Sequence, residues 1–341
     1  MENKKPLTLM STDLHIQPNN VDIIKELVYQ QICISKDLGI DTNLFLGDMV
    51  VSRQAQPSIV MEAIECILDI FNKNNINLIG IPGNHEKTNY KSFYSFLSPF
   101  RYHPAFTFFD MYDGTTIGDS YFHFLPFISE EIWIEMFNDI KLQKDKKNYL
   151  ISHIGMEGSV NNDGSKQSSI IKPSMFKEFD KVFLGHFHNF QQLGKNIYHI
   201  PSIRPSNYGE NNDKGVTVLY DDGSHETVHL DFKKYYTVKI DLTSTEKKDI
   251  NDLKKKYADS YDNIRFKFVG NESTNKSLSK EEFQSVGIDV VTELKELQYE
   301  EQDYEVERLE KDGIKEEFKV WCEKEDKDYE VGKKYIHKKL K

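Results

Sequence analysis

The alternation of apolar runs with helix-like segments constrains this chain most strongly. Strand-like runs cover residues 7–15, 43–46 and 76–81, and between them apolar residues recur every three or four positions, at 20–39 and 58–71. This β-α-β-α-β order predicts an α/β fold with layered, mixed β-sheets flanked by helices. Right-handed crossovers would bring the ends of the three strands to one edge of a sheet.

The middle of the chain continues this pattern, and its last third changes it. Further strands are predicted at 105–109, 121–127, 148–151, 182–184, 216–220 and 227–230, with a helix at 129–138. A smaller β-α-β unit follows, with strands at 236–240 and 263–269 around a helix at 246–257. We therefore expect a main α/β domain at 1–234, a small α+β capping domain at 235–292, and an acidic linker with one or two helices at 293–341.

Composition narrows the class of protein. With 341 residues, of which 38% are hydrophobic, the chain can bury a large core. It holds no apolar run of about 18 residues and no signal-peptide pattern, so we expect a cytoplasmic protein. Cys33, Cys66 and Cys322 lack C-x-x-C spacing, which argues against a disulfide framework or a thiolate zinc site and favours buried thiols.

The formal net charge is −11, so any attraction for phosphate must be local. Part of the acid excess lies at 293–310. A charge run of this kind is usually a solvated face or loop.

Five of the predicted strands end in side chains that bind metals or move protons. These are Asp13 and His15, Asp48, Asn84 and His85, His153, and His186 with His188. Taken singly, each has an ordinary explanation: the aspartates could cap helices, Asn84 could shape a turn, and a histidine could hydrogen-bond in the core. Taken together, and leaving His85 aside, they give one sheet edge two carboxylates, one amide oxygen and four imidazoles.

This donor set has the number and type of ligands that two divalent metals require, with Asp48 bridging them. Oxygen and nitrogen ligands without a thiolate favour manganese, iron or another exchangeable ion over structural zinc. Two metals bring more positive charge than the two aspartates cancel, so the site would be locally cationic. Because such a pair binds a scissile phosphate and activates a shared water, the pattern predicts phosphoester hydrolysis. His85, beside Asn84, would contact the phosphate or protonate the leaving oxygen.

The chain carries, in order, the motifs D-x-H, G-D, G-N-H-E, an isolated H and G-H-x-H. This set resembles the signature of the calcineurin-like metallophosphoesterases, over about residues 7–188. The resemblance implies two divalent cations, with manganese as the expected metal, and His85 as the catalytic histidine. It also implies two ligand sets: Asp13, His15, Asp48 and His188 for one metal, and Asp48, Asn84, His153 and His186 for the other.

Within that superfamily the chain is similar to the SbcD nuclease subunits and to the recombination endonuclease subunits of T-even phages. The similarity lies in the residues around His153, at 152–158, and in those that follow the last motif, at 196–202 and 214–218. It implies a metal-dependent DNA exonuclease or endonuclease, the catalytic subunit of an SbcCD-like complex for DNA repair and recombination.

Departures from that subfamily keep rival functions open. Glu86 stands where SbcD-like enzymes usually have aspartate, 200–202 replaces a Gly-Ser-Pro-like turn, and 50–52 lacks an expected phenylalanine and aspartate. A cyclic-nucleotide or small-molecule phosphodiesterase or phosphatase would use the same ligands, although it has little need of the residues after 235. The chain could also belong to a non-enzymatic class, as a catalytically silent scaffold for an ATPase. The presence of every expected ligand argues against this alternative.

The C-terminal segment predicts a partner. Its apolar residues would form a stripe on otherwise charged helices, and these residues are Ile314, Phe318, Trp321, Tyr329, Ile336 and Leu340. By resemblance, the partner would be the coiled-coil base of an SbcC-like ATPase, with this chain a homodimer inside a heterotetramer. The alternative is that the stripe packs on the chain's own capping domain.

Overall fold

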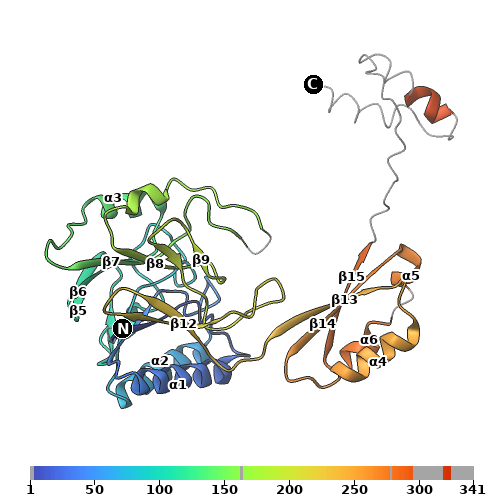
Figure 1. The fold of residues 1–341 in the computed structure, drawn as a ribbon, viewed down its shortest axis with the longest axis horizontal. Coiled ribbons are helices and arrows are strands. Elements are labelled where there is room, and N and C mark those ends of the chain that lie inside the picture. Colours follow the sequence, from blue (N-terminus) through green and yellow to red (C-terminus); the bar gives the residue numbers. More distant parts are fainter. Residues whose placement is uncertain (1–3, 162–163, 277–278, 295–317, 324–341) are drawn as a thin grey trace. The chain divides into compact units, whose positions relative to one another are not determined.

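Figure 1 shows the computed structural model, which describes residues 4–161, 164–276, 279–294 and 318–323. The chain divides into two compact units, Met1–Glu293 and Leu294–Lys341. The described residues of the first unit form two six-stranded sheets, a three-stranded sheet and helices, and in the second unit residues 318–323 are helical. Within these described ranges, no helix combines the length and the apolar composition needed to cross a membrane.

The first six-stranded sheet contains the N-terminal strands, in the order β12-β11-β1-β2-β3-β4. Its strands are β1 (Pro6–Ser11), β2 (Thr42–Phe45), β3 (Asn77–Gly80), β4 (Phe106–Phe108), β11 (Gly215–Tyr220) and β12 (His225–His229). β1 to β4 run parallel, and β11 pairs antiparallel with both β1 and β12. The three predicted N-terminal strands therefore end at one edge, as expected.

The second six-stranded sheet has the order β5-β6-β7-β8-β10-β9. Its strands are β5 (Asp113–Ile117), β6 (Ser120–Leu125), β7 (Lys147–His153), β8 (Lys181–Gly185), β9 (Gln191–Gln192) and β10 (Ile197–His199). The strands that lead to His153 and His186 belong to this sheet, whereas those that lead to Asp13 and Asp48 belong to the first. The expectation that all site residues lie at the edge of one sheet was therefore wrong. An apolar run in the sequence does not reveal which sheet its strand joins.

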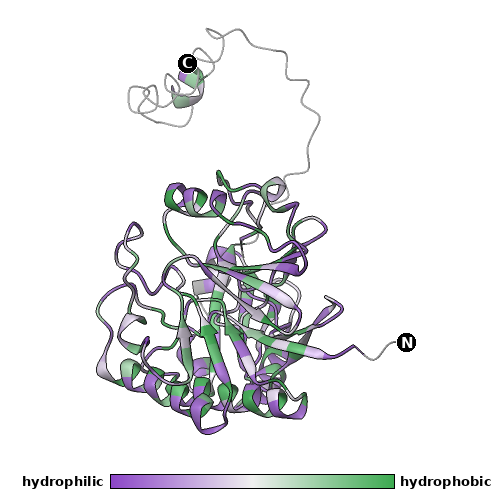
Figure 2. Cartoon of the chain, turned by 90° about the vertical axis from the view of Figure 1, so that its left-hand side faces the viewer, coloured by the Kyte–Doolittle hydropathy of each residue, from purple (hydrophilic) through white to green (hydrophobic). Residues whose placement is uncertain are grey.

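The two sheets pack face to face through a buried core. Residues of both contribute to it: Met10, Leu44, Leu46, Ile79 and Leu219 from the first, and Phe122, Phe124, Tyr149, Ile151 and Phe183 from the second. Figure 2 shows hydrophobic residues concentrated in the central strands. A strand buried on both faces needs a nearly continuous apolar sequence, which explains the unbroken runs that the sequence shows.

Helices cover the outer faces of this sandwich. α1 (Val21–Asp37) and α2 (Ser58–Lys73) lie side by side and share a second core with the first sheet (Figure 1). α3 (Glu130–Asn138) packs on the second sheet through the fully buried Trp133, together with the 3₁₀ turn η2 (Pro173–Phe176). Another 3₁₀ turn, η1 (Ser98–Phe100), precedes β4. The helices predicted at 20–39, 58–71 and 129–138 are thus confirmed to within a few residues at their ends.

The smaller α+β part follows from Tyr235. It consists of β13 (Tyr235–Asp241), α4 (Lys247–Tyr257), β14 (Asn263–Gly270), α5 (Glu272–Lys276), α6 (Glu281–Gln284) and β15 (Ile288–Leu294), with sheet order β13-β14-β15. β13 and β14 run parallel, which confirms the predicted β-α-β unit. Its core is built around Phe266, Phe268 and Phe283. The sequence did not predict β15 or the two short helices.

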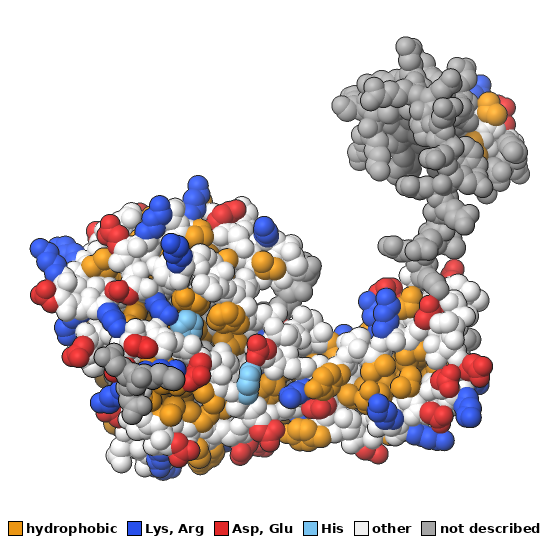
Figure 3. All heavy atoms as spheres, viewed as in Figure 1, with side chains coloured by type: hydrophobic (Ala, Val, Ile, Leu, Met, Phe, Trp, Pro, Cys, Tyr) orange, Lys and Arg blue, Asp and Glu red, His pale blue; other side chains and the backbone are white. Residues whose placement is uncertain are grey.

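The surface mixes charges of both signs. On the face shown in Figure 3, Lys and Arg side chains lie among Asp and Glu side chains. All three cysteines are free, but Cys33 on α1 is exposed, Cys66 is half-buried and only Cys322 is buried. The expectation of buried thiols was thus wrong for Cys33, because the buried face of α1 runs through Val28 and Ile32 and leaves the next position outside.

Candidate metal centre

The loops that follow five parallel strands meet where the edges of the two large sheets come together. The loops after β1, β2 and β3 supply Asp13, His15, Asp48, Asn84 and His85, and the ends of β7 and β8 supply His153, His186 and His188. The structure brings all eight predicted site residues into one cluster. They come from two sheets, and the face-to-face packing of those sheets sets the distance between the residues that each sheet supplies.

One half of the cluster contains Asp13, His15 and His188. The Oδ1 atom of Asp13 lies 3.6 Å from Nε2 of His15 and 3.7 Å from Nε2 of His188. These two nitrogens lie 3.0 Å from each other. Asp13 Oδ1 is buried and has no hydrogen-bond partner. A buried carboxylate oxygen without a donor is costly, and a cation held between it and the two nitrogens would satisfy it.

The other half contains Asn84, His153 and His186. The Oδ1 atom of Asn84 lies 3.1 Å from Nε2 of His153 and 2.8 Å from Nδ1 of His186. Asp48 Oδ2 lies 3.3 Å from Nε2 of His153 and 3.9 Å from Nε2 of His15. Asp48 therefore stands between the two halves, where a bridging carboxylate is required. Oxygen and nitrogen donors converge on two neighbouring points, so the residues fit two divalent cations.

Hydrogen bonds on the far side of three rings fix which nitrogen faces the cluster. Nδ1–H of His153 donates to the Leu46 carbonyl at 2.7 Å, and Nδ1–H of His188 donates to Oε1 of Glu210 at 2.9 Å. Nδ1 of His15 lies 3.3 Å from the Val50 carbonyl. Each contact occupies Nδ1 and turns Nε2 inward, so that Nε2 can bind a metal once it has lost its proton. Sequence reasoning missed Glu210, because a carboxylate that follows His188 after 22 positions has no motif of its own.

The backbone at the cluster adopts conformations that side chains ordinarily avoid. Asp13, His15, Asp48 and His186 have φ angles of 54°, 49°, 61° and 88°. Left-handed backbone at a residue other than glycine costs about 1–3 kcal/mol and persists where its surroundings impose it. The Asn20 side chain, for instance, donates to the His15 carbonyl at 2.9 Å. Strain of this kind collects at functional sites.

Two glycines allow the loops to approach this closely. A Cβ atom at Gly83 would collide with the Asp48 carboxylate. At Gly47, where φ is +98°, a Cβ atom would come within 2.7 Å of the His153 Nδ1 atom. The glycines of G-D and G-N-H-E are therefore required for the packing of the two loops and not only for turns.

The electrostatics of the cluster favour bound cations. Burial alone would raise the pKa of Asp13 and Asp48, but the neighbouring histidines outweigh it, so that the pKa of Asp13 falls far below its usual range and that of Asp48 to about 2. Burial alone would lower the pKa of His15 and His153, but the two carboxylates raise both to about 9. The negative potential that holds a proton on these imidazoles equally attracts a metal ion.

His85 occupies a different position from the seven predicted ligands. Its Nδ1–H donates to the Val51 carbonyl, and its Nε2 lies 3.9 Å from Asp48 Oδ2. Burial lowers the pKa of its imidazole, which favours the neutral ring. The ring lines a cleft of about 440 Å³ together with His15, His188, Arg204, Ser206 and Tyr235. His85 thus lies at the open side of the cluster, where a substrate would arrive.

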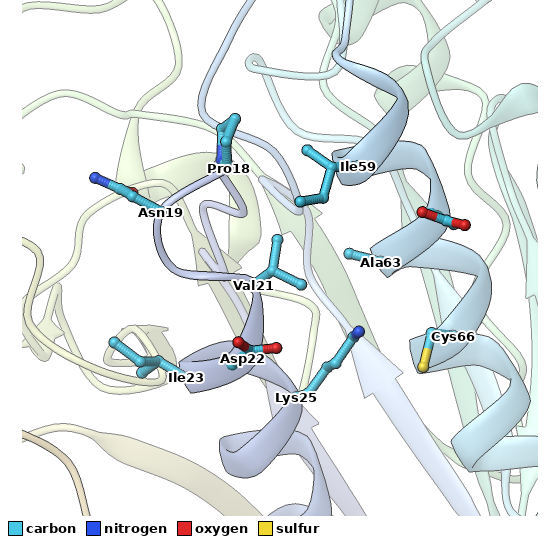
Figure 4. A pocket seen from close by; sticks show the side chains of 10 residues that line it. Pro18, Asn19, Val21, Asp22, Ile23, Lys25, Ile59, Ala63 and Cys66 are labelled. Carbon is cyan, nitrogen blue, oxygen red and sulfur yellow. The ribbon is translucent and has the colours of Figure 1, made fainter.

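A second hollow, of about 610 Å³, lies between α1 and α2 (Figure 4). In this view Val21 at the start of α1 and Ala63 on α2 face the gap, with Asp22 and Lys25 beside them. Its lining includes none of the eight site residues. The chemistry of the protein therefore belongs to the histidine-lined cleft.

Comparison with known proteins agrees with this geometry. The model of the calcineurin-like phosphoesterase family matches residues 8–190, which is more than half of the 341 residues. The chain belongs to the calcineurin-like phosphoesterase family. A metal-dependent hydrolase of phosphoesters is the activity that this membership indicates. A search of curated proteins finds no match.

Two solved structures are among those similar to this phosphoesterase. One is the calcineurin-like phosphoesterase YfkN of Bacillus subtilis, with 14% identity and a TM-score of 0.39, over 67% of this chain and 89% of that chain. The other is a dimetal phosphatase of Danio rerio, with 10% identity and a TM-score of 0.39, over 63% of this chain and 93% of that chain.

Glu86 holds the two metal-binding loops of this phosphoesterase together. Its buried carboxylate accepts backbone N–H groups from Gly83 at 2.7 Å, Asp48 at 2.9 Å and Val50 at 2.9 Å. Burial and the nearby Asp48 raise its pKa to about 7, although the N–H groups of Val50 and Gly83 oppose the shift. Glu86 thus has a structural role.

We predict that Glu86→Ala destabilises the metal-free protein by at least about 3 kcal/mol. The substitution leaves three buried N–H groups without an acceptor, and each such loss costs about 1–3 kcal/mol. Urea unfolding of the full chain in chelator measures the effect. Glu65→Ala, at an exposed position on α2, is the matched control. A change of less than about 0.5 kcal/mol for Glu86→Ala would refute the role given to this carboxylate.

Proposed function

We propose that this phosphoesterase is a DNA nuclease that depends on two metal ions and serves as the catalytic subunit of an SbcCD-like repair and recombination complex. The observation that carries the proposal is the pair of donor groups that share Asp48, with His85 beside them at the open cleft. We further propose that it acts in the cytoplasm.

The seven predicted ligands would hold the metals in two sets. Asp13, His15, Asp48 and His188 form one, and Asp48, Asn84, His153 and His186 form the other. Two such ions, for which we propose manganese, neutralise phosphate charge and lower the pKa of a bound water. The protein's own contribution is rigidity, because carbonyls and Glu210 fix the rings and Glu86 fixes the loops.

His85 would act on the substrate itself. Its Nδ1–H is held by the Val51 carbonyl, so its Nε2 is the nitrogen available to the cleft. From there it can contact a phosphate oxygen or, when Nε2 is protonated as well, deliver a proton to the leaving oxygen. Asn84, the preceding residue, supplies the ligand atom on the metal side.

The α+β part supports a nucleic acid as the substrate. Tyr235, the first residue of β13, lines the same cleft as His15 and His85. An aromatic side chain beside a phosphate site offers a surface on which a base can stack. A phosphatase or phosphodiesterase for small molecules would use the same metals. The following assay distinguishes that alternative function from a DNA nuclease.

We expect the purified protein with manganese to cleave short labelled DNA strands, and chelator to abolish cleavage. His85→Ala should retain the metals but lower kcat by about 10²–10⁴-fold, because a general acid or base contributes a factor of that size. Gel analysis of products gives the rates, and elemental analysis of the same samples gives the metal content.

Exposed His229 serves as the matched control, since its imidazole belongs neither to the predicted ligands nor to the lining of the cleft. Rapid hydrolysis of small phosphodiesters without cleavage of any DNA would overturn the nuclease and favour the rival. Loss of metal in parallel with activity in His85→Ala would instead make His85 a ligand.

For the C-terminal segment we propose docking onto an SbcC-like ATPase. Of its predicted stripe, Phe318 and Trp321 lie on the helical residues 318–323, with ring centroids 5.8 Å apart, and Trp321 is about half exposed. Ile314, Tyr329, Ile336 and Leu340 lie outside the described residues. An exposed indole on a charged helix is the kind of anchor that a partner groove covers.

Trp321→Ala in the full chain should abolish co-purification with a co-expressed SbcC-like ATPase, because truncation of an anchor residue typically costs about 2 kcal/mol or more. Glu323→Ala, exposed on the same helix, is the control and should co-purify normally. If Trp321→Ala still binds the ATPase as tightly as the unchanged protein, the stripe does not dock there and packing on the chain itself becomes the better explanation.

A further inference from the structure

We propose that the cleft beside the metal centre has a second subsite, in which Arg204 binds the phosphate next to the scissile one in a polynucleotide strand and Tyr235 stacks on the base between them. This inference rests on the proposed nuclease function and names the feature of the substrate that the site recognises.

The cleft is larger than the phosphate site alone. Its volume of about 440 Å³ lies within the range of small-molecule sites, about 300–1,000 Å³. One wall carries His15, His85 and His188, and the lining continues through Ser206 to Arg204 and Tyr235. A substrate with only one phosphate would leave this second part of the cleft unused.

Arg204 is fixed in relation to the metal centre by its own loop. Ser202 N–H donates to the His188 carbonyl at 3.0 Å, and Ile203 N–H donates to the Thr12 carbonyl at 3.3 Å. Both acceptors are neighbours of predicted ligands or ligands themselves. The backbone that carries Arg204 is therefore tied to the loops that hold the predicted ligands.

The guanidinium of Arg204 has hydrogen-bonding capacity to spare. One of its terminal nitrogens, Nη1, donates to the Pro205 carbonyl at 3.0 Å, but its Nε is buried and has no hydrogen-bond partner. The Tyr235 side chain also hydrogen-bonds to the Arg204 side chain. Glu210, whose carboxylate attracts the guanidinium, is already bound to His188 at 2.9 Å and Lys214 at 3.1 Å. A half-buried guanidinium that carries a positive charge and keeps one donor unused is suited to a phosphate oxygen.

Tyr235 is held as a platform. Its backbone N–H donates to the Asn212 side chain at 2.9 Å, and its carbonyl accepts from the same side chain at 2.9 Å. Its ring meets that of Tyr208 edge-on at 4.8 Å, and the Arg265 guanidinium lies 3.9 Å from the centre of the Tyr208 ring. A half-buried ring held in this way and lining the cleft can stack on a base, an interaction that is tolerant of base identity.

A neighbouring cleft limits how far a bound polynucleotide can extend beyond Arg204 and Tyr235. That cleft, of about 480 Å³, shares Arg204 and Tyr235 but is also lined by Asp22, Glu26 and Asp231. Its three carboxylates outnumber its two cations, Arg204 and Lys233, so this cleft would repel a polyanion. The subsite should therefore recognise one flanking phosphate and no more along this path.

The test compares thymidine trinucleotide, which has two phosphodiesters, with bis(p-nitrophenyl) phosphate, which has one. In Arg204→Ala the ratio of kcat/KM for the trinucleotide to that for the simple diester should fall by at least about 10-fold, because a charge-assisted hydrogen bond contributes about 1.5–3 kcal/mol. Arg204→Lys should recover part of the ratio. Lys233→Ala, the matched cation of the acidic cleft, should leave the ratio as it is.

A binding measurement separates this inference from the function on which it rests. In chelator, fluorescence anisotropy of a labelled trinucleotide should give a Kd at least about 10-fold weaker for Arg204→Ala than for Lys233→Ala. If the unchanged protein cleaves only the simple diester, the nuclease proposal fails. If it cleaves the trinucleotide but Arg204→Ala lowers both activities equally, or neither, the second subsite is refuted.

Discussion

Two buried carboxylates, Asp13 and Asp48, dominate the physics of this protein. Both are almost completely removed from solvent at the place where two sheets meet, and each raises the cost of ionising the other. Such a pair is stable only with positive charge nearby. The histidines provide some of it when they carry protons, and divalent cations would provide more. The sandwich, the strained loops and the glycines can all be understood as the means of holding these charges in place.

The architecture explains why eight side chains from distant positions converge. Parallel strands of one sheet deliver Asp13, Asp48 and Asn84 at the same edge, and the second sheet faces them with His153 and His186. The core between the sheets, rich in phenylalanine, fixes the separation of the two halves. A cavity in that core would move ligands of one half with respect to the other, so stability and site geometry depend on the same residues.

The sequence predicted much of this and could not predict the rest, for identifiable reasons. Buried parallel strands read as apolar runs, so β1, β2, β3, β7 and β8 were found together with the polar residues that end them. Which sheet each strand joins depends on pairing across the fold, and no local pattern encodes it. Glu210 was missed because it acts through His188, which is distant in sequence, and Arg204 because no motif marks it. The partner and the substrate remain predictions.

Anomalous diffraction from crystals soaked in manganese would test the central claim most directly. We predict two manganese peaks, one enclosed by Asp13, His15 and His188 and the other by Asn84, His153 and His186, with the Asp48 carboxylate between them. A single peak at full occupancy, with Asp48 contacting it alone, would contradict the two-metal account, as would strong peaks only at sites outside this cluster.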